Sequence, residues 1–93
     1  MYVLKEIRMD NVGRICISQL FDEIPKEVLV LYDTEKNALF FRGNFVGDWP
    51  SAQRKVDSKN RVVIPKWIRD KTGDEFYLVP ESKRDHCLLI KNS

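Results

Sequence analysis

Short apolar runs alternate with polar turns along the chain, and the same order of runs occurs in each half. Each run is rich in β-branched, leucine or aromatic residues and is bounded by turn-forming residues, which is typical of β-strands. The runs cover residues 15–17, 28–32 and 38–42 in the first half, and 62–64, 75–79 and 87–91 in the second. This pattern predicts a mainly β protein with short helices.

The two halves share a local motif. Residues 10–17 and 57–64 both read Asp-x-x-x-Arg followed by three apolar residues, 47 positions apart. The later apolar runs follow in the same order, with Val28 aligned to Glu75 and Ala38 to Cys87. We interpret this as an internal duplication, with repeats at about 3–42 and 53–91 and a connector at 43–51.

Each motif predicts a tight turn between two strands. The Asp carboxylate can accept hydrogen bonds from backbone groups that follow it, so Asp10 and Asp57 are expected to start the turns. Gly13 and Asn60 occupy the matching position, and both residue types tolerate a positive φ. The first strands are expected at 7–9 and 54–56.

A short helix is expected after the middle strand of each repeat. In the second repeat it covers Lys66–Lys71, with Pro65 near its start and Gly73 at its end. The face formed by Ile64, Ile68 and Trp67 is expected to be buried.

In the first repeat, Ser18 is expected to cap a helix over Gln19–Glu23. A hairpin closes each repeat, with polar loops at 33–37 and 81–85. Phe45, Val46 and Trp49 in the connector are expected to pack against the domain.

A length of 93 residues fits one domain. A unit of about 45 residues cannot easily bury both faces of four short strands. Two units can close on each other, which removes exposed strand edges. We therefore predict a single-chain closed β-barrel of two β-β-α-β-β repeats, with an ordinary α+β sandwich as the alternative.

The net charge of +2 hides a local excess. Between Arg54 and Lys71, seven basic residues are opposed by Asp57 and Asp70 alone. Such an excess is typical of surfaces that bind nucleic acid.

Other features exclude some classes of protein. Cys16 and Cys87 each lie in an apolar run and are expected to be reduced core residues. The chain has no apolar stretch of about 18 residues and no signal-peptide pattern, so we expect a cytoplasmic protein without membrane contact. His86 is the only histidine, and no nucleophile–base pair, phosphate loop or metal-ligand spacing is visible. We expect no enzyme activity, cofactor, metal or small-molecule substrate.

Residues 54–69 read RKVDSKNRVVIPKWIR and resemble the signature of the AbrB/MazE/SpoVT family, RKVDxxGRVxIPxx[LI]R. The resemblance covers about 40 residues well, with Asn60 in place of Gly, and the first repeat follows the same plan with weaker identity. It implies a cradle-loop barrel, RIFT-like rather than swapped-hairpin or double-psi, that binds DNA as a monomer or homodimer.

The resemblance also implies which residues contact DNA. Arg54, Arg61 and Arg69 match arginines that the family uses, and Lys55 matches a basic neighbour. Asp70 stands where many relatives have Arg, and Ile7, Asp22 and Glu23 replace Arg54, Arg69 and Asp70 in the first repeat. The full candidate set consists of basic residues: Arg54, Lys55, Lys59, Arg61, Lys66, Arg69, Arg8 and Arg14.

Two alternatives apply to these residues. Asp57–Arg61 and Asp10–Arg14 could simply brace their turns, and Lys59 and Lys66 could form a solvated face. For the whole protein, the prediction is a DNA-binding regulator, and the alternative is a non-enzymatic interaction barrel that has lost DNA binding. An antitoxin role is disfavoured because no acidic C-terminal arm follows the second repeat.

Overall fold

A computed structural model describes residues 3–43, 47–80 and 86–91, which form eight strands and one short helix. The strands are β1 (Lys5–Arg8), β2 (Arg14–Cys16), β3 (Glu27–Asp33), β4 (Ala38–Arg42), β5 (Ser51–Lys55), β6 (Arg61–Val63), β7 (Glu75–Pro80) and β8 (His86–Ile90), and the helix α1 is Lys66–Thr72. The prediction of a mainly β protein with helical content is confirmed.

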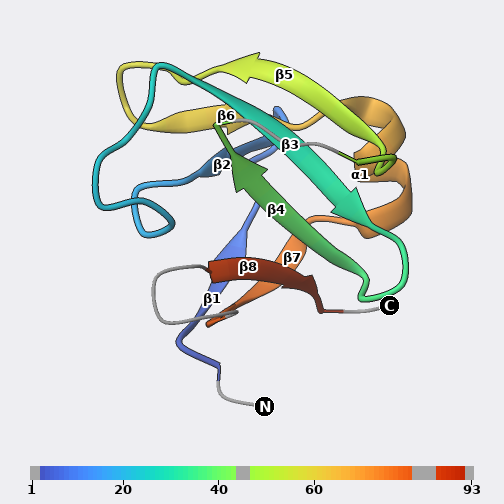
Figure 1. Cartoon of the computed structure of the whole chain (residues 1–93). Helices are drawn as coiled ribbons and strands as arrows, with labels where there is room; N and C mark the ends of the chain where they lie inside the picture. The colour runs from blue at the N-terminus through green and yellow to red at the C-terminus, as the bar shows by residue number, and fades with distance from the viewer. Residues whose placement is uncertain (1–2, 44–46, 81–85, 92–93) are drawn as a thin grey trace.

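The strands form two sheets (Figure 1). Six strands pair in the order β1-β7-β8-β4-β3-β5, and the remaining two, β2 and β6, pair with each other. All of the pairs are antiparallel. If β1–β4 are exchanged for β5–β8 in order, each sheet has the same strand order read in reverse. The two halves are therefore related by an approximate two-fold axis.

The two halves are intertwined rather than placed side by side. β1 of the first half pairs with β7 of the second, and β5 of the second half pairs with β3 of the first. The third and fourth strands of each half form a hairpin, and the two hairpins meet where β4 pairs with β8. Neither half therefore holds its own first strand.

The pairing register corrects the alignment of the later strands. Ile7 pairs with Phe76, and Arg54, which occupies the same place as Ile7, pairs with Val28. Val28 therefore corresponds to Phe76 and not to Glu75. The difference of one residue arises because the segment that contains the helix is longer in the second half.

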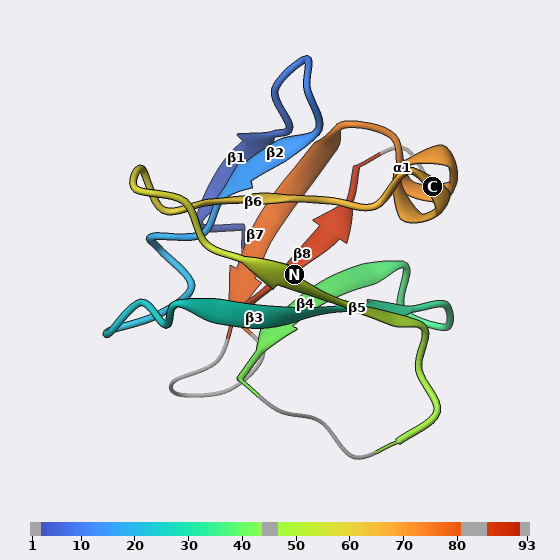
Figure 2. The same cartoon turned by 90° about the horizontal axis from the view of Figure 1, so that it is seen from above.

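The six-stranded sheet does not close into a barrel, so this part of the prediction is wrong. The sheet ends at β1 and β5, and β2 and β6 form a separate two-stranded sheet, here called the ribbon (Figure 2). β5 and β6 are connected through a side chain: Arg54 Nε donates a hydrogen bond to the Val63 carbonyl at 3.2 Å. Strands of three residues leave little backbone for closure by further pairing.

The core fills the space between the ribbon and the six-stranded sheet. Ile15 and Val62, from the centre of the ribbon, are fully buried with Phe76 and Leu88 from the larger sheet. A second apolar cluster on the other face of the sheet is centred on Phe40. Trp49 of the connector packs on Phe40, with ring centroids 5.4 Å apart. Phe45 and Val46 lie outside the described residues.

Among the described residues, a helix forms only in the second half. Pro65 precedes it, Ile68 is buried in the core, and Gly73 ends it with φ of 73°. The predicted helix over Gln19–Glu23 is wrong, because residues 18–20 form a turn in which the Leu20 N–H donates to Ile17. Pro25 disfavours helical backbone at Ile24, so this segment has room for little more than one turn.

The first hairpin follows its prediction. Asp33 Oδ1 accepts the N–H groups of Glu35 and Lys36, at 3.0 and 3.2 Å, and Asn37 has a φ of 50°. The matching loop at 81–85 lies outside the described residues.

Candidate nucleic-acid interface

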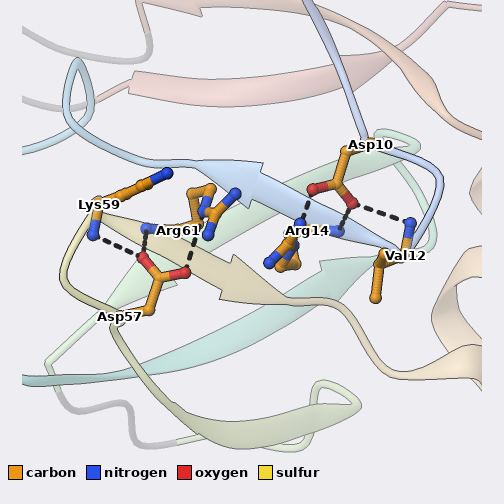
Figure 3. A network of polar contacts seen from close by, with 6 residues as sticks. All are labelled: Asp10, Val12, Arg14, Asp57, Lys59 and Arg61. Atoms are coloured by element: carbon orange, nitrogen blue, oxygen red, sulfur yellow. Dashed lines mark hydrogen bonds and ion pairs between the residues drawn. The ribbon is translucent and has the colours of Figure 1, made fainter.

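The two Asp-x-x-x-Arg motifs form turns with nearly the same hydrogen bonds (Figure 3). Oδ1 of Asp10 accepts the N–H groups of Val12 and Arg14, at 3.0 and 2.8 Å. Oδ1 of Asp57 accepts those of Lys59 and Arg61, at 2.9 and 2.8 Å. One carboxylate oxygen therefore organises each turn.

The second carboxylate oxygen holds the arginine. Oδ2 of Asp10 accepts Arg14 Nε at 2.7 Å, and Oδ2 of Asp57 accepts Arg61 Nε at 2.9 Å. Gly13 and Asn60 follow with φ of 89° and 62°, as predicted from their residue types. Both arginines therefore brace their turns, which is one of the two roles that the sequence allows for them.

These contacts hold the pKa of both carboxyl groups below the ordinary value of an aspartate, 3.8. For Asp10, the largest cause is the backbone N–H of Arg14, partly opposed by desolvation, and the Arg14 side chain and the Val12 N–H lower the pKa further. For Asp57, the largest cause is the backbone N–H of Arg61, again partly opposed by desolvation. A carboxylate that accepts several N–H groups is stabilised in its charged form.

Between the turns, the ribbon presents an exposed surface. Ile15 and Val62 point into the core, so their neighbours in the strands point outward. We call the outward set the ribbon face, and it consists of Arg14, Cys16, Arg61 and Val63. Arg14 pairs with Val63 and Arg61 with Cys16 in the register, so the two arginines are diagonal neighbours, with Cα atoms roughly 7–8 Å apart.

Both arginines keep donors available. Their side chains are 30% and 28% exposed, and within the described part of the chain only Nε of each guanidinium is hydrogen bonded. The four Nη atoms of the two groups remain for a ligand, while the aspartates restrict the rotamers. A guanidinium held in this way suits phosphate binding, because its donors are pre-oriented.

Lys55 and Lys59 lie at the Asp57 turn, and both are exposed. Neither forms an ion pair with any described residue. Arg54, by contrast, is half-buried and donates to the carbonyls of Val63 and Gln53. Arg54 therefore links strands β5 and β6 in addition to any contact with a ligand.

Arg8 and Lys66 have acidic partners. Arg8 contacts Asp74 at 3.5 Å, and Lys66 contacts Asp70 at 3.3 Å. All four side chains are more than half exposed, so these ion pairs are weak and solvent-screened.

Arg69 packs against the turn of the other half. A Cβ atom added at Gly13 would lie 2.5 Å from Arg69 Nη1 and 2.8 Å from its Cδ and Cζ. Arg69 Nε is buried and has no hydrogen-bond partner among the described residues. The helix of the second repeat thus lies beside the turn of the first repeat.

The eight candidate residues therefore do not form one group. The Gly13 carbonyl accepts the Ile64 N–H, and the Asn60 carbonyl accepts the Ile17 N–H, each at 2.8 Å. These bonds place each turn next to the segment that follows the middle strand of the other repeat. The basic turn of the second repeat and its helix lie at opposite ends of the ribbon, which the linear sequence does not reveal.

Two sequence-based expectations about this surface are wrong. Cys16 is exposed rather than buried, and its Sγ lies 3.3 Å from Ser18 Oγ, whereas Cys87 is buried as expected. Trp67 is 42% exposed, although Ile64 and Ile68 are fully buried. Strand alternation could have indicated Cys16, since both of its neighbours are buried.

Comparison with models of known protein families and with curated proteins finds no match to this sequence. Within the described part of the chain, no three His, Cys, Asp or Glu side chains gather in a way that could hold a metal ion. No helix among residues 3–43, 47–80 and 86–91 has the length and apolar character needed to cross a bilayer.

Proposed function

We propose that this protein is a non-enzymatic, duplex DNA-binding regulator, similar in class to AbrB, and that the ribbon face is its DNA contact. The observation that carries this proposal is the pair of outward arginines, Arg14 and Arg61, each fixed by an aspartate through Nε alone. Lys59 extends the cationic surface at one end. The two-fold related turns also support a cradle-loop type of fold, RIFT-like but in an open form.

A salt titration tests the proposal. Three phosphate contacts, from Arg14, Lys59 and Arg61, give a slope of log K against log salt of about −3. Affinity for a 20-bp mixed-sequence duplex is then expected to fall roughly 40-fold between 50 and 200 mM salt. Absence of binding by the wild-type protein at 50 mM salt would contradict the proposal.

Lys59→Gln is the sharpest variant, because the Lys59 side chain makes no hydrogen bond or ion pair with any described residue and its loss should not disturb the turn. We expect weaker binding and a slope smaller in magnitude by about one. Lys71→Gln is the matched control, since Lys71 is also exposed and makes no ion pair with a described residue. The control removes the same charge from the helix and should leave most of the affinity.

A protein partner is the second candidate, favoured by exposed apolar side chains near the first turn. Val12, Val63 and Trp67 are 55%, 44% and 42% exposed. Exposed aromatic residues are enriched in protein interfaces. Capture of a host protein by the wild type but not by Trp67→Ala, without DNA binding by either, would favour this candidate.

A further inference from the structure

The tips of the two turns make the same hydrogen bond to their aspartates but carry different side chains. Val12 and Lys59 hold equivalent positions, and both donate their backbone N–H to the aspartate two residues earlier, at 3.0 and 2.9 Å. Since the backbones share these bonds, the two Cβ atoms leave the turns in equivalent directions. One tip therefore presents an exposed valine where the other presents an exposed lysine.

The tips also lie at a spacing that suits a duplex. By continuation of the β2–β6 register, Lys59 is level with Ser18, about six residues along the strand from Val12. At about 3.3 Å per residue, less the curl of the turns, the tips are on the order of 15–20 Å apart. The major groove of B-DNA is about 12 Å wide, so phosphates on its two sides, related by the two-fold axis of the duplex, are within reach of two tips at this spacing. Arg14 and Arg61 lie between the tips (Figure 3).

We propose that both turns lie against one duplex at the same time and that the contact is directional. The Lys59 turn contributes a phosphate contact, and the Val12 turn occupies the equivalent place on the duplex without one. This inference rests on the proposed function. It adds that the two halves of one chain contact DNA as the two subunits of a dimer would. The first half contacts DNA more weakly, because residue 12 is a valine.

A gain-of-contact experiment tests the inference. Four proteins are compared on the same 20-bp mixed-sequence duplex: the wild type, Val12→Lys, Lys59→Val and the double variant V12K/K59V. Val12→Lys is expected to make the slope of log K against log salt steeper by about one. Its gain in affinity over the wild type should therefore be about threefold or more larger at 50 mM salt than at 200 mM salt. Lys59→Val is expected to have the opposite effect.

The double variant provides the most specific outcome. It moves the lysine from one tip to the other at constant net charge, so its slope and affinity should match those of the wild type. Val3→Lys is the matched control, because Val3 is 37% exposed and precedes β1, at the far end of that strand from the first turn. It adds the same charge and should not steepen the slope. Thermal unfolding of every variant verifies that the turns are intact.

The outcomes separate this inference from the proposed function. If Lys59→Val weakens binding but Val12→Lys changes nothing, only one turn contacts the duplex and the inference is overturned, while the proposed function stands. If Val12→Lys and Val3→Lys have equal effects, the gain is one of general charge and the inference is also overturned. If the wild type fails to bind at 50 mM salt, the proposed function fails and this inference fails with it.

Discussion

Gly13 has no room for a side chain unless Arg69 moves, whereas Asn60, at the matching turn position, already carries one. The difference comes from Arg69, whose guanidinium lies over Gly13. The first repeat has no helix in the corresponding segment, whose described residues 18–20 form a turn. The two turn positions therefore tolerate substitution differently, although both have a positive φ.

Gly13→Ala is expected to destabilise the protein more than Asn60→Ala. Both variants put an alanine in left-handed backbone, which costs about 1–2 kcal/mol. Only the first also crowds Arg69, and a further 1 kcal/mol would lower Tm by roughly 4–8 °C in a domain of this size. Thermal unfolding measures the difference, and Arg69→Ala should recover part of it in the Gly13→Ala background. Equal losses for Gly13→Ala and Asn60→Ala would show that Arg69 does not restrict this position.

At the scale of elements, the turns link stability to pH. Asp10 and Asp57 have folded-state pKa values below 3.8, so their ionised forms stabilise the fold. For a group with a lowered pKa, this stabilisation is complete above the unfolded-state pKa and is lost as the pH falls through the folded-state pKa. We expect the free energy of unfolding to be nearly constant between pH 7 and 5 and to fall below about pH 4.

Asp57→Asn isolates the contribution of one turn. The amide keeps an oxygen acceptor but cannot be ionised, so this variant should be less stable at pH 7 and lose less stability between pH 5 and 3. Urea unfolding at each pH provides the measurement. Asp48→Asn is a control, because Asp48 is exposed in the connector and forms no hydrogen bond or ion pair with a described residue. An unchanged acid response in Asp57→Asn would contradict the assignment.

Local chemistry explains which elements could be predicted from the sequence. The turns follow from Asp and from Gly or Asn at fixed positions, and the second helix follows from Pro65 and Gly73. The first helix could not be excluded from Ser18 alone, since Pro25 acts from beyond the predicted segment. Sheet closure and the opposite placement of turn and helix depend on pairing between halves, which no local pattern specifies. Cys16 lies in an apolar run but on the outward face of its strand, and the apolar run alone does not distinguish the two faces.

At the scale of the molecule, the two halves depend on each other. The first strand of each half pairs with the hairpin of the other half, and the ribbon consists of one strand from each half. Fully buried residues from both halves, such as Ile15 and Val62, meet at the centre of the core. The connector therefore mainly raises the effective concentration of one half for the other.

Fragments 1–43 and 47–93 test this interdependence. Each alone lacks the partner of its first strand and half of the core, so neither should unfold cooperatively as a monomer. Mixed in equal amounts, they are expected to form a 1:1 complex with the circular dichroism spectrum of the intact chain. The complex should be less stable at micromolar concentration, since association costs entropy that the intact chain does not lose.

Self-association of one fragment would be consistent with the two-fold pairing, because each fragment carries a version of every strand. Cooperative unfolding of either fragment as a monomer would instead show that one repeat is a complete folding unit, and the intertwined pairing would then not be what holds the protein together.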